Sequence, residues 1–328
     1  MTASVLSRSP VTTYVSHRLH RDERTWPETN CHVDLWIELL HARGLEPLAG
    51  LAFTLGIDYE GDQFTFYKFP HNDLRMLYGI EVQELDLWKS LEAHTAQQCA
   101  LGRAMLVEVD AFYLPDTAGV SYRYEHGKTT IGVAAIDVVR QELRYFHGRG
   151  YHTLGGNDYA GLFRLGEFAA DVGVLPPFAE IAKLDGVRRL DTRALVERAS
   201  ALARLHFVGA PAVNPVARFA NGLAADLVWL RDDPRASVHQ YAVATVRRAG
   251  SCFGLTASFL QWLAANGSRG VLEAAGAFER LSNAAKTVQF KLARMTRLNQ
   301  GADIGTDVAV MAAAWDEGMS RLSDRFAR

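Results

Sequence analysis

The amino-acid composition changes once along the chain, and that change limits the folds that the chain can adopt. Residues 25–155 are rich in aromatic, β-branched and turn-forming residues, whereas residues 156–328 are dominated by alanine, leucine and arginine. The first set favours strands and turns, and the second favours helices. We therefore expect an N-terminal extension at 1–24, an α+β domain at 25–155 and an α-helical domain at 156–328.

Hydrophobic periodicity predicts the individual elements. In the first domain we expect helices at 31–40 and 86–99, and strands at 63–69, 104–109, 129–136 and 142–147. In the second domain we expect helices at 192–207, 215–230, 238–266, 271–298 and 307–326. A leading helix followed by a small, mainly antiparallel sheet is the α+β pattern.

The composition excludes several classes of protein. The net charge is -2, which argues against a dedicated nucleic-acid binder. Three widely spaced cysteines with no CxxC favour a reducing compartment over a disulfide scaffold or a zinc site. No apolar run approaches the ~18 residues of a membrane span, and the first residues lack the apolar core of a secretory signal. We expect a cytoplasmic protein with no metal and with no nucleic-acid or membrane partner.

The segment Thr25–Cys31, TWPETNC, delivers a cysteine to the first turn of the first predicted helix. Pro27 disfavours helix upstream, and Thr29 or Asn30 can accept the free N–H groups as the N-cap. The positive end of a helix dipole favours a thiolate. Cys31 is therefore either a nucleophile, with its own backbone N–H and Asn30 at the oxyanion position, or a small buried apolar residue.

A cysteine nucleophile needs a histidine base, and His126 stands just before the strand predicted at 129–136. Asp110 ends the preceding strand, before a loop that returns to His126, and is our choice for the carboxylate that orients the imidazole. Asp137 is a second candidate, but a strand that rises ~3.3 Å per residue puts it at the far end from His126. A turn role is favoured for Asp137, and a Cys–His dyad without a carboxylate stays open.

These residues resemble the motif of a known family. Asp110-Ala111-Phe112-Tyr113-Leu114-Pro115, then His126, then the apolar strand that closes on Asp137, resembles the N-terminal region of the butirosin biosynthesis protein H family. The resemblance implies a papain-like fold, Cys31 as nucleophile and His126 as general base. It also implies an acyltransferase that moves an aminoacyl group from a carrier-protein thioester to an amine. The sequence departs from that family's pattern near His147, where an aspartate is expected after the second strand.

The whole chain also resembles a bacterial family linked to carrier proteins and carrier-directed amino-acid ligases, through TWPETNC and Glu60-Gly61-Asp62-Gln63-Phe64. This resemblance implies an acidic carrier protein as partner, whose phosphopantetheine arm brings the acyl group, a small amine as acceptor, and no other cofactor. Cations recur along the C-terminal helices at Arg280, Lys286, Lys291, Arg294 and Arg297. Such a face is usually only solvated, but it can also receive an acidic partner.

The leading hypothesis is a cysteine-dependent aminoacyl transferase. One alternative is hydrolysis by the same Cys–His site, as in a thioesterase, amidase or peptidase. Another is a non-catalytic protein that binds a carrier protein. Among the other candidates, His32 is expected at the surface because neighbouring residues do not share a helix face, and Cys99 and Cys252 are expected in the core.

Overall fold

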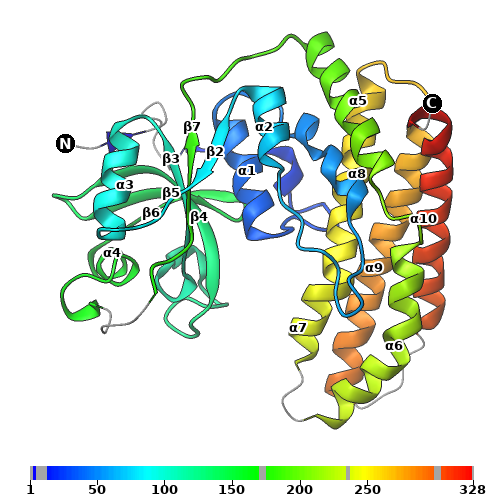
Figure 1. Cartoon of the computed structure of the whole chain (residues 1–328). Coiled ribbons are helices and arrows are strands. Elements are labelled where there is room, and N and C mark those ends of the chain that lie inside the picture. The colour runs from blue at the N-terminus through cyan, green and yellow to red at the C-terminus, as the bar shows by residue number, and fades with distance from the viewer. Residues whose placement is uncertain (1–2, 5–12, 170–174, 234–236, 299–303, 327–328) are drawn as a thin grey trace. The chain divides into compact units, whose positions relative to one another are not determined.

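The computed structural model describes residues 3–4, 13–169, 175–233, 237–298 and 304–326, and the chain divides into two compact units (Figure 1). Unit 1 comprises Met1–Asp22, Asn30–Pro47 and Pro70–Arg189; unit 2 comprises Glu23–Thr29, Leu48–Phe69 and Leu190–Arg328. Each unit is therefore assembled from segments that are distant in the sequence.

Unit 1 is built on one antiparallel sheet. Its strands are β1 Ala3–Ser4, β2 Glu81–Glu84, β3 Ala104–Asp110, β4 Lys128–Asp137, β5 Glu142–His147, β6 Gly150–Gly155 and β7 Ala179–Lys183. The strands lie in the order β2-β7-β3-β4-β5-β6, and β1 pairs with the last part of β4. β7 is the last strand in the sequence, yet it lies between β2 and β3, so the sheet is completed only after residue 179.

Helices cover both faces of this sheet. Unit 1 contains α1 Cys31–Ala42, α2 His71–Tyr78, α3 Leu91–Ala100 and α4 Gly156–Leu162, with short 3-10 turns η2 Arg18–His20, η4 Ala111–Tyr113, η5 Pro115–Thr117 and η6 Gly166–Phe168. A Cβ at Gly132 would lie 2.6 Å from Leu35 of α1, so glycine there lets α1 pack closely on β4. Thr95 of α3 contacts Met105, whose neighbour Leu106 pairs with Gly132. Adjacent strand residues face opposite sides, so α1 and α3 lie on opposite faces.

Helix α1 is buried along most of its length and carries two carboxylates with it. Every residue from His32 to Leu40 is buried, including Asp34 and Glu38. The imidazole of His20 lies between these carboxylates, with Nδ1 on Glu38 and Nε2 3.4 Å from Asp34. Burial alone would lower the pKa of His20, but the hydrogen bonds and negative charges of Asp34 and Glu38 raise it to about 9.

Unit 2 is helical. Its elements are η3 Pro47–Gly56, α5 Thr192–Val208, α6 Pro215–Asp232, α7 Val238–Ala242, the π-helical turn η7 Val243–Arg247, α8 Arg248–Ala265, α9 Leu272–Leu298 and α10 Gly305–Phe326. Trp26 joins this unit: its Nε1 donates to Ser282 Oγ at 3.0 Å, and the ammonium of Lys286 lies 4.1 Å from its ring. A Cβ at Gly250 would approach the Trp26 ring to 2.6 Å, so the glycine makes room for the indole.

The α+β class and the helical C-terminal region are confirmed. The helices predicted after residue 190 and the strands predicted at 104–109, 129–136 and 142–147 all exist with nearly the expected bounds. Among the described helices, none combines the length and the apolar character that crossing a membrane requires.

Four fold predictions are wrong. The helix predicted at 86–99 begins only at Leu91, because Ser90 is its N-cap and accepts the N–H of Ala93. Residues 63–69 form only an isolated bridge, Tyr59 with Phe64, and belong to unit 2. The boundary at 155/156 falls inside unit 1, because β7 returns to the sheet. Residues 13–22 of the expected N-terminal extension pack within unit 1, with Leu19 buried, whereas residues 1–2 and 5–12 lie outside the described residues.

The His20 cluster predicts that stability falls in alkaline solution. The folded pKa of His20, about 9, exceeds its ordinary value of 6.5, so the stabilisation is complete below pH 6.5 and is lost as the pH rises through 9. The shift corresponds to at most about 3 kcal/mol. Urea unfolding between pH 6 and pH 10 measures this loss. The His20→Gln variant should have a lower free energy of unfolding at pH 6 than the wild type, and this free energy should change little up to pH 10. A wild-type free energy of unfolding that also changes little over this range would contradict the prediction.

Candidate functional site

Cys31 is the first residue of α1 and is partly exposed. Asn30 is the N-cap, since its side-chain oxygen accepts the N–H groups of His32 and Val33 at 3.1 and 3.0 Å. The predicted cap and the start of the helix are therefore as the sequence indicates. The capping oxygen of Asn30 is committed to the N–H groups of His32 and Val33, so the backbone N–H of Cys31 is the donor of this first turn that can face an oxyanion.

A histidine–carboxylate pair lies beside the first turn of α1. His71 Nε2 is 3.1 Å from Glu180 Oε1, and His32 Nε2 is 3.9 Å from the other carboxylate oxygen. The side chain of Glu180 is only 7% exposed, whereas that of His71 is 46% exposed. The expectation that His32 lies at the surface is wrong, because it is buried against β7. A buried carboxylate that orients an accessible imidazole is the usual arrangement of a general base.

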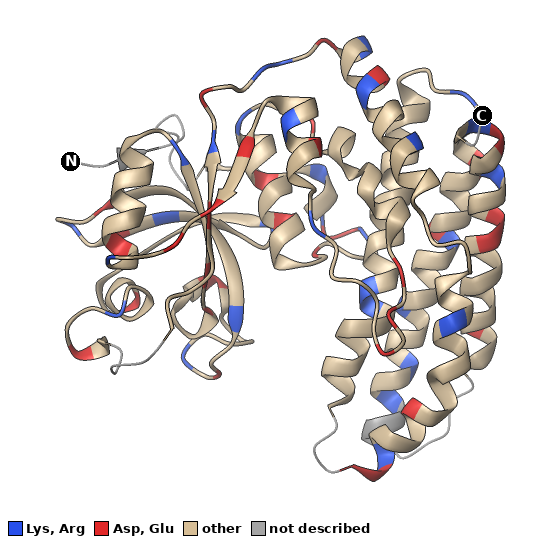
Figure 2. Cartoon of the chain, in the orientation of Figure 1, with Lys and Arg blue, Asp and Glu red and all other residues tan. Residues whose placement is uncertain are grey.

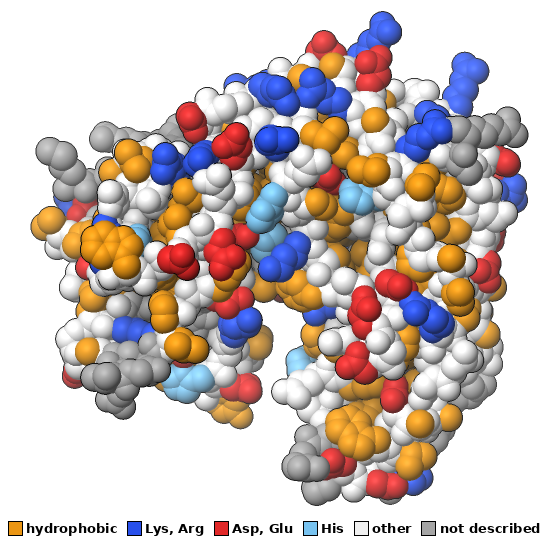
Figure 3. All heavy atoms as spheres, viewed as in Figure 1, with side chains coloured by type: hydrophobic (Ala, Val, Ile, Leu, Met, Phe, Trp, Pro, Cys, Tyr) orange, Lys and Arg blue, Asp and Glu red, His pale blue; other side chains and the backbone are white. Residues whose placement is uncertain are grey.

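Sequence reasoning missed His71 and Glu180. Glu180 lies on β7, far along the chain from Cys31, and no motif connects the two. One signal was present: Glu180 interrupts the apolar strand Ala179–Lys183, and a charged residue inside a buried strand calls for a partner. Figure 3 shows histidine side chains at the surface beside acidic ones in the region of α1 and α2.

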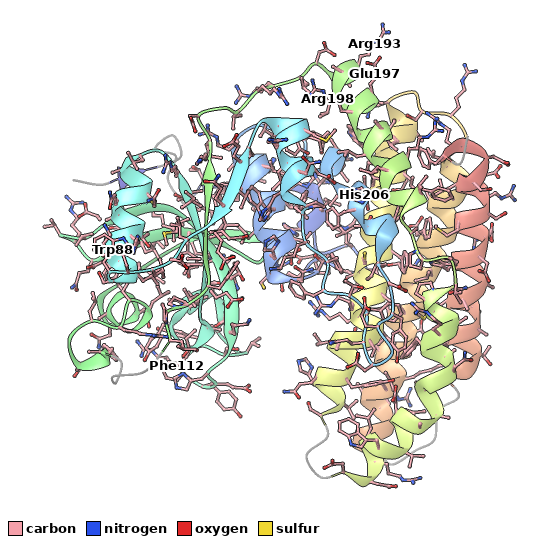
Figure 4. The ribbon with its side chains drawn as sticks, in the orientation of Figure 1. Trp88, Phe112, Arg193, Glu197, Arg198 and His206 are labelled. Atoms are coloured by element: carbon pink, nitrogen blue, oxygen red, sulfur yellow. The ribbon has the colours of Figure 1, made fainter. Side chains whose placement is uncertain are left out.

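His126 and Asp110 meet at the end of the β3–β4 pair. His126 Nδ1 lies 2.5 Å from Asp110 Oδ2, and the imidazole stacks on Phe112, which is labelled in Figure 4, with ring centroids 4.3 Å apart. Asp110 Oδ1 also accepts the N–H groups of Phe112 and Gly127, both at 3.1 Å. The carboxylate thus holds the loop closed as well as orienting the imidazole. The side chain of His126 is 69% exposed.

A cavity lies beside this pair. His126 and Asp110 line a hollow of about 380 Å³, which shares Asp110, Glu108 and Arg164 with a neighbouring cavity of about 540 Å³. The larger cavity is lined by apolar side chains of the α3 and α4 region and by Lys89 and Arg164. It is large enough for a small acyl or aminoacyl group.

Cys31 and His126 lie on different segments of unit 1. Leu35, one helical turn after Cys31, packs on Gly132, and a turn rises about 5 Å. Gly132 is six residues beyond His126, which is roughly 20 Å of extended chain. Among the described residues, no hydrogen bond joins Cys31 and His126.

Asp137 forms the turn after β4, the role that the sequence favours for it. Its Oδ1 accepts the N–H groups of Val139 and Arg140, both at 3.1 Å. The residue ends β4, whereas His126 precedes the start of that strand. Asp137 is therefore placed to shape the hairpin, at the end of β4 opposite to His126.

Three of the five cations noted on the C-terminal helices are engaged inside unit 2, and the side chain of Arg297 lies outside the described residues. Arg280 pairs with Glu317, and Lys291 pairs with Asp307, each at 2.5 Å. Lys286 covers Trp26, and burial together with the charge of Arg247 lowers the pKa of Lys286. Figure 2 shows acidic and basic residues interspersed along these helices. In the part of the chain that the structure describes, no three His, Cys, Asp or Glu side chains are grouped to hold a metal ion.

Comparisons with known proteins cover both units. Residues 15–184 match the family described as DUF1839 N-terminal domain, and residues 192–324 match the DUF1839 C-terminal domain. A search of curated proteins found no match. The matched ranges meet between β7 and α5, where unit 1 passes into the main part of unit 2.

The cap geometry predicts the effect of replacing Asn30. Asn30→Ala removes the acceptor of two N–H groups and should lower the free energy of unfolding by about 1 kcal/mol. Asn30→Asp keeps an acceptor oxygen and should stay within a few tenths of a kcal/mol of the wild type. Chemical denaturation followed by circular dichroism measures both. Equal stability of Asn30→Ala and wild type would show that the cap contributes little to α1.

Proposed function

This chain belongs to the DUF1839 family, and we propose that its N-terminal domain is a cysteine-dependent acyltransferase with Cys31 as the nucleophile. The observation that carries the proposal is the His71–Glu180 pair beside the first turn of α1. A partly exposed thiol at a helix N-terminus and an oriented imidazole near it are the two parts that covalent cysteine catalysis needs. The finer proposal of a papain-like fold rests on the same parts: a leading helix that carries the cysteine and an antiparallel sheet behind it.

The reaction follows from these parts. His71 takes the proton of the Cys31 thiol, and the sulfur attacks the carbonyl carbon of a thioester. The oxyanion is stabilised by the backbone N–H of Cys31 and by the positive end of the α1 dipole, and the intermediate collapses with loss of a thiol that takes its proton from His71. An amine then attacks the acyl-Cys31 thioester and gives its proton to His71, and the amide leaves with the Cys31 sulfur free again.

We choose His71 over His126 as the base because of position. His71 shares Glu180 with His32, the residue next to Cys31, whereas His126 lies toward the far end of β4. His126 remains the base that the sequence resemblance implies, and its cavity could hold the acyl group. The choice between the two histidines is open to a direct test.

The acyl donor in this proposal is an aminoacyl group on the phosphopantetheine arm of an acidic carrier protein, and the acceptor is a small amine. This part rests on the sequence resemblance alone. The paired state of Arg280 and Lys291 weakens the C-terminal helices as the docking face for such a carrier. Hydrolysis is the competing outcome, with water in place of the amine.

The test uses an aminoacyl pantetheine thioester as donor and intact mass spectrometry as readout. Wild type should gain an aminoacyl adduct, and Cys31→Ala should gain none. His71→Gln should lower the rate of adduct formation by about 100-fold, the usual effect of losing a general base. The matched control, His126→Gln, should keep the rate within a few-fold of the wild type.

The outcomes separate the alternatives. Loss of acylation in His126→Gln but not in His71→Gln would return the base to His126. An unchanged adduct in Cys31→Ala would exclude Cys31 as the nucleophile. No adduct and no thioester turnover in the wild type would leave the acyltransferase proposal without support. Adding a primary amine then distinguishes transfer, which gives an amide, from hydrolysis, which gives a free acid.

A further inference from the structure

A hydrogen-bonded chain of three side chains lies on the sheet face opposite α1. Thr129 Oγ1 lies 2.8 Å from His147 Nε2, and His147 Nδ1 lies 2.5 Å from Asp116 Oδ2. Thr129 is in β4, His147 ends β5, and Asp116 is in η5, on the loop that leaves β3. The order of groups, hydroxyl, imidazole and carboxylate, is that of a nucleophile, a base and an orienting acid.

The carboxylate of Asp116 is fixed on both sides. Tyr145 donates its hydroxyl to Oδ1, while His147 occupies Oδ2. Burial would raise the pKa of Asp116, but the hydrogen bond from His147, the charges of His147 and His152 and the hydroxyl of Tyr145 outweigh burial and lower it. The carboxylate is therefore ionised at neutral pH and accepts from both neighbours.

This arrangement fixes the tautomer of His147. Because Asp116 is ionised and can only accept, Nδ1 of His147 must carry the proton. In the neutral imidazole Nε2 then holds a lone pair, and the Thr129 hydroxyl must donate to it. In this tautomer a neutral His147 can take the proton of Thr129 at Nε2.

Burial is graded along the chain of groups in the way that such a relay requires. The side chain of Asp116 is 10% exposed and that of His147 is 12% exposed, while Thr129 is partly exposed near the start of β4. His152, whose side chain is 30% exposed, lies with its Nε2 3.9 Å from Asp116 at the rim. The acid and the base are therefore shielded to a similar degree, and the residue that carries the hydroxyl is partly exposed.

From this geometry we infer that Thr129, His147 and Asp116 form a second acyl-transfer site, which cleaves esters of small acyl groups. Thr129 Oγ1 attacks the ester carbonyl while its proton moves to His147 Nε2, and the leaving alcohol takes that proton as its bond to carbon breaks. Water then attacks acyl-Thr129 and gives a proton to His147, which returns it to the Thr129 oxygen as the acid leaves. The inference does not depend on Cys31, which lies on a helix packed on the other face of the sheet.

The test is made in full-length Cys31→Ala protein, so that the thiol contributes nothing. The substrate is p-nitrophenyl acetate, with release of nitrophenolate and peptide mass spectrometry as readouts. We expect an acetyl group on the peptide that contains Thr129. Thr129→Val, which keeps the shape and loses the hydroxyl, should abolish the adduct and lower turnover by at least about 100-fold.

Two further variants separate catalysis from a loss of structure. Thr129→Ser keeps the hydroxyl and should retain turnover within a few-fold, so a Val/Ser difference at equal melting temperature supports a nucleophile. Asp116→Asn should lower turnover because the amide permits the wrong tautomer of His147. Equal turnover in Thr129→Val and the Cys31→Ala parent, or an acetyl group found elsewhere, would overturn the inference. Neither result would affect the thioester assay of Cys31.

Discussion

Helix α1 brings Asp34 and Glu38 into the interior, and the imidazole of His20 is what makes this possible. Buried carboxylates are costly unless they are paired and hydrogen-bonded. Glu38 is surrounded on several sides, since Tyr14 and the N–H of His17 also donate to it. The segment before α1 is therefore part of the fold, because it supplies the positive charge and the donors that the helix needs. The position of Cys31 depends on this arrangement, since the same helix begins at the cysteine.

The second constraint is the return of β7 to the middle of the sheet. In register, Glu180 pairs with Leu106 and Leu106 with Gly132, so Glu180 lies on the row of the sheet that α1 crosses. A single-residue shift of β7 would turn Glu180 to the other face and separate it from both histidines. The strand pairing is thus what places a carboxylate beside the start of α1. Alternating side chains give the opposite face to Thr129 and His147.

Much of the local structure could be predicted from the sequence, and much of the assembly could not. The Asn30 cap, the C-terminal helices and the contact of His126 with Asp110 follow from signals within a few residues or within one loop. The division into units could not be predicted in this way. Trp26 packs against Gly250, which is distant in the sequence, and the residues around Trp26 give no signal of that contact. The His71–Glu180 pair could not be predicted for the same reason. It depends on the register of β7, a strand that the sequence composition assigned to the helical domain.

The histidine–carboxylate pairs of unit 1 show that such a pair is not by itself evidence of catalysis. His20 is sealed from solvent between Asp34 and Glu38, so this pairing stabilises the fold. His126 is open to solvent, and its carboxylate also holds a loop, so water competes for the imidazole. What distinguishes His71 and His147 is the group that each can serve. Near His71 lies the turn that carries a thiol, and His147 already holds the hydroxyl of Thr129 on the nitrogen left free by Asp116. Since a base acts only on a proton within its reach, the position of the nucleophile decides between these pairs more strongly than the strength of the ion pair.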